Sequence, residues 1–312
     1  MPHAPPLDPR VTRARSITCC TRSLPLAAAS APLAAHRQIE ALKQAFALRM
    51  SIGDPAFVPE AAAVVADMLS YEFNVALHAN TSDWATRAQD EYAGRWRVPS
   101  GLPRDRGTSH FSIVDRERNA VAVTTTVNTG FGSKLVSNGL VLNNEMDDFS
   151  TPGQPNVYGL APSAANFIQP GKRPLSSMSP TIVLQPGFAA DGTPATVVRA
   201  VVGASGGPRI ISTVLQVLVR ALLRGDDAAA AVGLPRLHHQ YVPNIVHAED
   251  YEMLDGGWEV VPNATVEGLR LRGHRVERWA RHGVAQLVLQ DPDTRVLHAV
   301  SDRRKGGAPA GY

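Results

Sequence analysis

The feature that most constrains the fold is an abrupt change in the character of the chain at Thr108. Residues 80–107 are polar and carry several Pro and Gly residues toward their end, which is typical of an exposed loop. From Thr108 onward the chain instead contains two strand-like runs, 110–115 and 120–127, joined by a short polar turn. The pattern predicts an antiparallel hairpin that begins directly where a loop ends.

Further helices and strands are predicted on both sides of this hairpin, from apolar residues that recur at helical or strand spacing. The predicted helices are 38–49, 59–69 and 209–223, and the predicted strands are 181–184, 196–203, 285–290 and 296–300. Strands, then a helix, then strands predict an α+β layered sandwich and not a parallel nucleotide-binding fold. Residues 143–180 are rich in Asn, Pro, Gly and Ser and are predicted to form a long loop, which is usually functional in a compact domain.

Composition excludes several classes of function. The chain is 44% apolar and 19% charged, as expected for a globular protein. Its net charge is only +3 and much of the basic excess lies in the N-terminal tail, so no nucleic-acid partner is predicted. The only cysteines, Cys19 and Cys20, are adjacent, which leaves no disulfide framework, no cysteine metal site and no cysteine nucleophile after residue 20.

Residues 1–36 form a tail rich in Pro, Ala and Arg. Within residues 10–35, an apolar stretch, 24–35, follows several arginines, and acidic residues are nearly absent. This pattern fits a signal or transit peptide, and it equally fits a disordered or mispredicted N-terminus. No run approaches the ~18 apolar residues of a membrane-spanning helix.

The Gly107-Thr108 junction has a chemical property of its own. A threonine hydroxyl is a poor nucleophile, but a threonine at a chain N-terminus has a base of its own, the α-amine, with a pKa of about 7.7–8.0. Cleavage before Thr108 would create both groups in one step. Taken alone, a Gly-Thr pair at a loop–strand boundary is more often structural than catalytic. The surrounding motifs are therefore needed to choose between the two interpretations.

Those motifs occur in a fixed order. They are GTSHFSIVD, VTTTVNTGFGSK, LNNEMDDFS, KRPLSSMSPTIV, GASGGPRI and SDRRKGGAPAGY, and they extend over essentially all of residues 108–312. Together they resemble the small subunit of the γ-glutamyltransferase (glutathione hydrolase) family. The segments IEALKQAFALR and GDPAFV are similar to the C-terminal end of the family's large subunit. The resemblance implies three parts: a tail at 1–36, a large-subunit remnant with its processing loop at 37–107, and a catalytic small subunit at 108–312.

The resemblance also implies a role for each matching residue. Thr108 would be the nucleophile of both autoprocessing and acyl transfer, and Thr126 would hydrogen-bond the nucleophile region. The residues expected to hold the α-amino group of the γ-glutamyl donor are Asn128, Glu145 and Asp148. The residues expected to hold its α-carboxylate, with a basic residue of the large subunit, are Ser176 and Ser177. Gly206 and Gly207 would donate to the oxyanion, and Tyr158 matches a lid tyrosine of some members.

The residue types fit these roles, although each has a plainer reading. Carboxylates suit a ligand ammonium, but NNEMDDF could also be a solvated acidic turn. Hydroxyls suit a carboxylate, but paired serines are common in loops. Glycines before a helix suit an oxyanion hole, but a tight turn also needs them. The pair His238-His239 suggests a metal, yet adjacent residues of an extended segment point opposite ways, so we interpret it as structural.

The expected fold is the four-layer αββα sandwich of N-terminal-nucleophile hydrolases, incomplete here because most of the large-subunit part is absent. The expected reaction is attack of Thr108 on the γ-amide carbonyl of glutathione or another γ-glutamyl donor. The acyl group would pass to water, an amino acid or a dipeptide, with no metal or cofactor. Family members are typically extracellular or plasma-membrane-associated, but the location of this chain stays open.

The missing part leaves alternatives. The chain could be a truncated gene product, a light-chain-only paralogue that acts by association without catalysis, or a chain that assembles with a separately made large subunit. A related acylase acting on a different amide is a further reading, which the intact set Asn128, Glu145 and Asp148 disfavours. Because the basic residue of the carboxylate site belongs to the missing part, and Arg173 is expected at the loop surface, little activity is expected from the chain alone.

Overall fold

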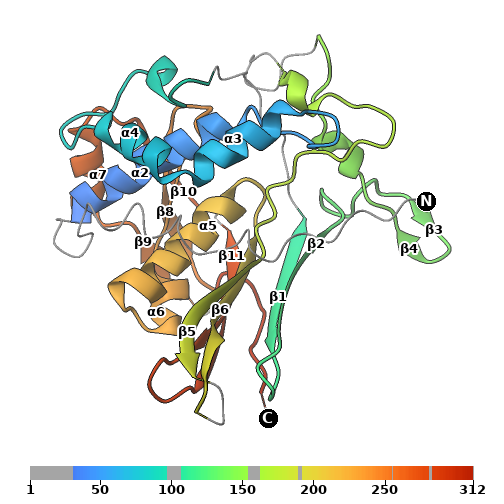
Figure 1. Ribbon diagram of the computed structural model, residues 1–312, viewed down its shortest axis with the longest axis vertical. Helices are drawn as coiled ribbons and strands as arrows, with labels where there is room; N and C mark the ends of the chain where they lie inside the picture. Colours follow the sequence, from blue (N-terminus) through green and yellow to red (C-terminus); the bar gives the residue numbers. More distant parts are fainter. Residues whose placement is uncertain are drawn as a thin grey trace.

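The computed structural model describes residues 31–96, 107–153, 162–188, 192–254, 256–280 and 283–311. Most of the N-terminal tail and the predicted lid residue Tyr158 lie outside these ranges. Helices lie on one side of the molecule and the long strands run beneath and beside them (Figure 1). No helix in the described part is both long and apolar enough to cross a membrane.

In the part of the chain that the structure describes, three α-helices precede the hairpin: α2 (Ala31–Arg49), α3 (Glu60–Leu69) and α4 (Tyr71–Ala79). The helical spacing predicted over 38–49 is confirmed, because Ile39, Leu42 and Phe46 are at most 1% exposed, although α2 begins well before residue 38. The helix predicted over 59–69 is also confirmed as α3, in which Val64 is buried and Val65 is 40% exposed. The sequence pattern did not predict α4, which begins where the Ser70 hydroxyl accepts a hydrogen bond from the Phe73 amide.

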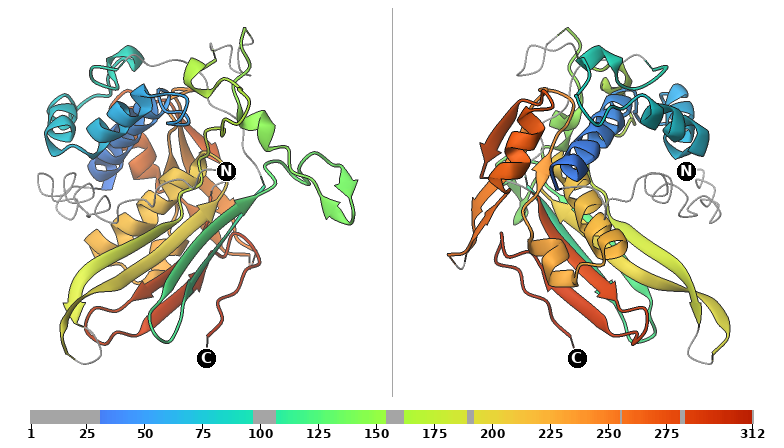
Figure 2. Two further views of the ribbon diagram at one scale, coloured as in Figure 1. Left: turned by 45° about the vertical axis from the view of Figure 1, so that its right-hand side comes forward. Right: turned by 90° about the vertical axis from the view of Figure 1, so that its left-hand side faces the viewer.

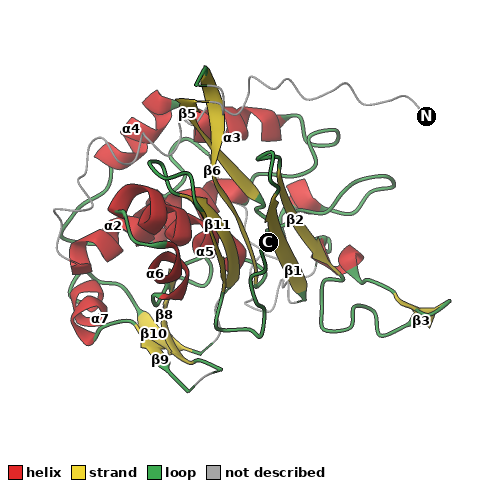
Figure 3. Ribbon diagram, turned by 90° about the horizontal axis from the view of Figure 1, so that it is seen from below, coloured by secondary structure: helices red, strands yellow, loops and turns green. Residues whose placement is uncertain are grey.

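The predicted hairpin is present, with β1 (Thr108–Val114) antiparallel to β2 (Ala120–Thr126). It packs by one face on a four-stranded sheet of order β12-β11-β6-β5, and helices cover the other face of that sheet (Figure 3). The strands of the larger sheet are β5 (Thr181–Phe188), β6 (Pro194–Ser205), β11 (Val284–Gln290) and β12 (Leu297–Ser301). All four were predicted within a few residues of their observed bounds. The described residues therefore form a helical layer, the four-stranded sheet and the β1–β2 hairpin, stacked as in a layered sandwich.

The helical layer consists of α5 (Arg209–Leu218), continued by a π-helical turn (Val219–Arg224), and α6 (Ala228–Gly233). A second sheet, with order β10-β8-β7 and β9 paired to β8, was not predicted. It is built from β7 (Leu237–His238), β8 (Val246–Glu252), β9 (Trp258–Val260) and β10 (Val276–Trp279). Helix α7 (Asn263–Arg270) precedes β10, which pairs in parallel with β8.

Two apolar clusters hold these layers together. One joins the inner face of α5 and α6 to β6 and β11. The other joins α2, through Ile39, Leu42 and Phe46, to residues around β7, β8 and α7 such as Val246 and Leu269. Full burial of each such side chain contributes about 1.5–3 kcal/mol. The segment before Thr108 is therefore held against the segment after it by packing as well as by the peptide bond.

Among the exposed apolar side chains of the described residues, two groups lie on β-hairpins. The outer face of β1 presents Phe111 and Ile113, which are 45% and 51% exposed. A small hairpin, β3 (Val136–Ser137) with β4 (Leu140–Val141), projects from the body of the molecule (Figure 2). The exposed apolar residues of this projecting hairpin and its base are Phe131, Leu135, Val136, Leu140, Val141 and Leu142.

Candidate active site

Thr108 is the first residue of β1, it lies opposite Thr126, and it is 4% exposed. Its hydroxyl donates to Thr126 Oγ1 over 3.4 Å, and the Thr126 hydroxyl donates to the carbonyl oxygen of Gly107 over 3.2 Å. The Asn128 amide donates to Thr126 Oγ1 over 2.8 Å, which fixes that hydroxyl in place. A chain of hydroxyls therefore leads from Thr108 to the carbonyl of the peptide bond that precedes it.

Gly107 could not be another residue without strain. Its φ is +146°, and an added Cβ would lie 2.5 Å from the Asn128 carbonyl oxygen and 2.7 Å from that of Thr129. Both contacts are with backbone, so neither neighbour could move away as a side chain would. The backbone therefore requires glycine at this junction.

His110 holds β1 against the larger sheet. It lies two residues after Thr108 on the inner face of β1, and a Cβ at Gly203 of β6 would come within 2.2 Å of its ring. Its Nδ1 pairs with Thr124 Oγ1 at 2.8 Å and its Nε2 with Ser112 Oγ at 3.0 Å. Burial lowers the pKa of His110 to about 4, so the ring is neutral and both of its nitrogens are used for structure.

Gly206 and Gly207 connect the end of β6 to the first turn of α5. Their φ angles are +130° and +61°, and their carbonyls accept hydrogen bonds from the amides of Arg209 and Ile210. The pair therefore forms the entry to a helix N-terminus, where backbone amides favour negative charge. Positive φ at both positions supports the plainer reading as well, because the turn itself requires glycine.

The residues predicted to bind an ammonium group lie close together in the chain fold. Asn128, with φ +73° and no exposed surface, donates from Nδ2 to the Asn144 carbonyl, directly before Glu145. Asn128 Oδ1 and Glu145 Oε2 are buried and accept no hydrogen bond from any residue that the structure describes. Asp148 follows in the same short 3-10 turn (Glu145–Asp148) and is 2% exposed. Buried acceptors without donors cost about 1–3 kcal/mol each, and a ligand ammonium would satisfy them.

Ser177, predicted to bind a carboxylate, has a cationic neighbour that the sequence did not reveal. Arg49, the last residue of α2, donates from Nη2 to Ser177 Oγ over 3.0 Å, and both residues are buried. Ser176 is half-buried beside it. The expectation that this site lacks a cation within the chain is therefore wrong. Sequence offers one weak signal for Arg49, its place at the end of a predicted helix, because its partner lies 128 residues away.

Arg173, the alternative cation, is on the surface as predicted, with a 76% exposed side chain. It bonds Asp54 through its amide at 2.9 Å and its guanidinium at 3.1 Å. These bonds hold the pKa of Asp54 well below its usual range. The Ser163 hydroxyl also donates to the Met50 carbonyl over 2.9 Å. The loop that carries Ser176 and Ser177 is thus fastened to the turn after α2.

His238 and His239 have the structural role that we inferred from the sequence. His238 pairs with Ser212 Oγ at 2.7 Å and with Gln240 Oε1 at 3.0 Å, and burial lowers its pKa to about 3. His239 accepts the Tyr241 amide hydrogen at Nδ1 and pairs with Asn244 at Nε2. All four ring nitrogens therefore have protein partners.

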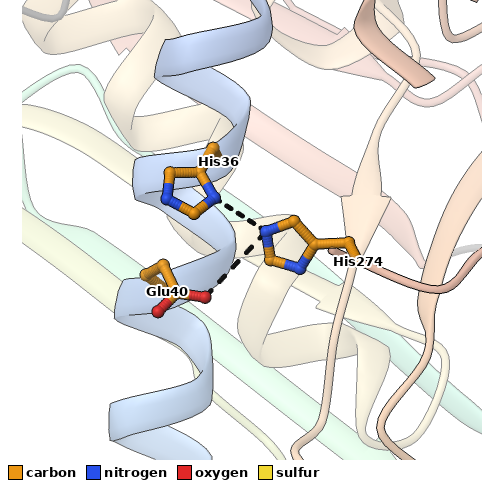
Figure 4. Close-up of side chains that lie close together, drawn as sticks. All are labelled: His36, Glu40 and His274. Atoms are coloured by element: carbon orange, nitrogen blue, oxygen red, sulfur yellow. Dashed lines mark hydrogen bonds and ion pairs between the residues drawn. The ribbon is translucent and has the colours of Figure 1, made fainter. Parts of the chain in front are cut away.

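A second histidine cluster has a donor set that suits a divalent cation. His36 and Glu40 of α2 meet His274, with 2.7 Å between His36 Nδ1 and His274 Nε2 and 3.9 Å between His274 Nε2 and Glu40 Oε1 (Figure 4). However, the Lys43 ammonium lies 3.4 Å from Glu40 and already neutralises it. His36 Nε2 also pairs with the Ser82 carbonyl at 2.6 Å. We therefore interpret the cluster as a hydrogen-bond network that ties α2 to the turn after α7.

Comparison with known proteins places this geometry in context. A family model described as gamma-glutamyltranspeptidase matches residues 21–312. Glutathione hydrolase 2 of Arabidopsis thaliana is 44% identical over 294 residues, which cover 91% of this chain and 48% of that protein. The chain thus spans about half the length of that relative.

Two further matches are informative. Glutathione hydrolase 4 of Arabidopsis thaliana, whose name includes the word "inactive", is 45% identical over 205 residues, 64% of this chain and 100% of that protein. Among solved structures, a threonine-to-alanine mutant of Helicobacter pylori gamma-glutamyltranspeptidase is 39% identical with a TM-score of 0.53. That alignment covers 63% of this chain and 100% of the matched chain.

Proposed function

Because this chain belongs to the γ-glutamyltranspeptidase family and has its N-terminal-nucleophile hydrolase fold, we propose that it hydrolyses glutathione and transfers γ-glutamyl groups with Thr108 as nucleophile. The observation that carries the proposal is the hydroxyl chain from Thr108 through Thr126 to the Gly107 carbonyl. It brings a nucleophile, a proton path and a scissile carbonyl together where β1 begins and β2 ends.

The first step is cleavage of the chain before Thr108. The Thr108 oxygen attacks the Gly107 carbonyl carbon, and its proton moves through the Thr126 hydroxyl toward the carbonyl oxygen. Collapse of the tetrahedral species breaks the Gly107–Thr108 C–N bond as a proton passes from the former carbonyl oxygen to the departing nitrogen. This step frees the α-amine of Thr108 and leaves an ester between Gly107 and the Thr108 hydroxyl oxygen. Water then cleaves the ester, which frees the Gly107 carboxylate and the Thr108 hydroxyl.

Donor recognition follows from the two sets of buried groups. Asn128 Oδ1, Glu145 Oε2 and the Asp148 carboxylate face the donor ammonium. Ser176, Ser177 and Arg49 hold the α-carboxylate, and Arg49 supplies the charge that two hydroxyls lack. An α-amino acid carrying its reactive carbonyl on the side chain matches both sets.

Acyl transfer then repeats the chemistry on the donor. The α-amine of Thr108 accepts the hydroxyl proton as the oxygen attacks the γ-carbonyl, and Gly206 and Gly207 stabilise the oxyanion. The γ-glutamyl ester forms as the C–N bond breaks and the amine, cysteinylglycine in the case of glutathione, leaves with the proton. Water, an amino acid or a dipeptide then attacks the ester and frees Thr108. Each step uses only protein groups, substrate and water.

The proposed partner is a large-subunit half, supplied by another chain or by the part of the relatives' length that this chain does not span. Two apolar surfaces suit such a partner: the outer face of β1, with Phe111 and Ile113, and the projecting hairpin, with Leu135, Val136 and Leu140. Exposed apolar strands of this kind are usually covered in a functional assembly.

The test is release of an aniline from a γ-glutamyl anilide by the full chain, expressed alone and with the N-terminal half of Arabidopsis glutathione hydrolase 2. We expect little turnover alone and clear turnover on co-expression, because the partner covers the exposed strands. Thr108→Ala should remove activity in both samples. Turnover that survives Thr108→Ala, or that is absent from a cleaved and assembled protein, would overturn the proposal.

A second candidate is a non-catalytic light chain that acts by association. It is favoured by the full-length match to Arabidopsis glutathione hydrolase 4, whose name includes the word "inactive". Stable assembly with the partner half, without cleavage at Gly107 and without turnover, would support this candidate against the first.

A further inference from the structure

Asn166 uses both ends of its side-chain amide to join two separate loops. It lies in a 3-10 turn (Ala164–Asn166) and is 2% exposed. Its Nδ2 donates to the Asp148 carbonyl over 2.7 Å, and its Oδ1 accepts the Leu175 amide hydrogen over 2.9 Å. One planar amide therefore connects the backbone at Asp148 to the backbone directly before Ser176.

The backbone of Asn166 strengthens this connection. Its carbonyl accepts the Ser150 amide hydrogen over 2.9 Å, and Phe167 forms a β-bridge with Ser150. The Ala164–Asn166 turn itself is seated on the segment after α2, where a Cβ at Gly53 would clash with the Ala165 carbonyl oxygen. Asn166 is thus a buried spacer that is held by its backbone as well as by its side chain.

We propose that Asn166 is a positioning residue that sets the distance between the ammonium site and the carboxylate site of the donor. This inference rests on the proposed function, because it assigns those two sites to Asp148 and to Ser176 with Ser177. The α-amino and α-carboxylate groups of an amino acid are a fixed distance apart on one carbon. A donor that uses both sites therefore senses their spacing, whereas a ligand with only one of the two groups does not.

The probes are three small compounds that differ only in these groups. L-glutamate has both, glutarate lacks the amino group, and 4-aminobutyrate lacks the α-carboxylate. Calorimetric titration of the full chain gives a Kd for each compound, independent of turnover. The variants are Asn166→Ala, which removes both side-chain bonds, and Asn166→Asp, which keeps an acceptor for Leu175 and removes the donor to Asp148.

Asn74 provides a matched control. It is half-buried and donates from Nδ2 to the carbonyls of Met68 and Ser70, between α3 and α4. Asn74→Ala removes a similar pair of bonds away from either donor loop. Thermal unfolding of all variants reports how much stability each substitution removes.

We expect Asn166→Ala to weaken L-glutamate binding about tenfold, the worth of one hydrogen bond, and to change the Kd of the other two compounds by less than about twofold. Asn166→Asp is expected to fold even if the alanine variant does not. It should weaken the binding of L-glutamate more than the binding of 4-aminobutyrate. Asn74→Ala should lower the unfolding temperature without changing any Kd.

Two results would overturn the inference. If Asn166→Ala weakened the binding of all three compounds equally, or left the Kd of L-glutamate unchanged, Asn166 would only stabilise the fold. Failure of the wild-type chain to prefer L-glutamate over both truncated compounds would overturn the donor site itself, and with it the proposed function.

Discussion

At the scale of single residues, the site depends on two kinds of polar group: a hydroxyl with more than one hydrogen-bond partner, and buried oxygens that accept no hydrogen bond in the described part of the chain. Thr126 accepts from Asn128 and Thr108 and donates to Gly107, so one hydroxyl serves three neighbours. Asn128 and Glu145 each keep a buried oxygen without a donor in the described part of the chain. Buried polar atoms of this kind are retained where a ligand completes them.

Arg49 provides the sharpest prediction at this scale. Arg49→Gln removes the cation beside Ser177 but keeps a side chain that can donate to its hydroxyl. We expect kcat/KM for a γ-glutamyl anilide to fall by the equivalent of about 2–5 kcal/mol, mainly through KM, as for loss of one member of a buried charge pair. Arg275→Gln, whose exposed pair with Glu277 is distant in the fold, is the control and should change little. Equal losses in the two variants would contradict the role of Arg49.

The family resemblance indicated Thr108, Thr126 and the donor-site residues, but neither Arg49 nor Asn166. The structure places Thr108 and Thr126 opposite each other in the β1–β2 hairpin. Arg49 donates a hydrogen bond to a residue 128 positions away in the chain. Asn166 bonds backbone groups, which every residue has, so the side chains at those positions do not indicate the contact. Tertiary contacts of this kind are set by packing and not by local pattern.

At the scale of secondary-structure elements, the segments with the clearest periodicity were predicted, whereas several short elements, and also α4, α7 and β8, were not. The β1–β2 hairpin, α5 and the β11–β12 hairpin each have clear alternation or helical spacing. β7 has only two residues, β9 has three, and α6 is six residues of mostly alanine, so none of them offers a repeat to detect. Of these missed elements, β7 contributes Leu237 to the cluster against which α2 packs, whereas α6 belongs to the cluster around β6 and β11.

The start of β1 provides the prediction for elements. Gly107→Ala would place a Cβ against the carbonyl oxygens of Asn128 and Thr129, at a φ that L-residues rarely adopt. The junction must then shift, and a misplacement of about 1 Å lowers the rate of a well-oriented reaction by about a hundredfold. We expect cleavage before Thr108 to slow by that order while the fold survives. Gly139→Ala, in the open turn of the projecting hairpin, is the control for a positive-φ glycine away from the site. Cleavage of Gly107→Ala at the wild-type rate would contradict the proposed geometry.

At the scale of the whole molecule, buried neutral histidines make stability depend on pH. Burial lowers the pKa of His274 to about 2, of His238 to about 3 and of His247 to about 4, whereas unfolded histidine titrates near 6.5. Between these values the unfolded chain binds more protons than the folded chain. The stabilisation is therefore present above pH 6.5 and is lost as the pH falls.

We expect the free energy of unfolding to decrease below pH 6.5 by up to about 1.4 kcal/mol per pH unit for each of these histidines. His274→Gln keeps a donor for His36 and removes one titrating group, so it should flatten the pH dependence. His298→Gln, at an exposed position of β12, is the matched control. Urea unfolding at pH 7, 6 and 5 measures the slope, and an unchanged slope for His274→Gln would contradict this account.

The packing of α2 against α7 and the second sheet also predicts that the two segments stay together once the peptide bond between them is cut. The central claim is that this cut creates the catalytic Thr108. Intact mass spectrometry of the co-expressed protein, acid-quenched during turnover of a γ-glutamyl donor, tests it most directly. The account predicts a fragment that begins at Thr108 and carries one γ-glutamyl group in ester linkage, and no such fragment in Thr108→Ala. An uncleaved chain that turns over donor, or a γ-glutamyl group on any other residue, would contradict it.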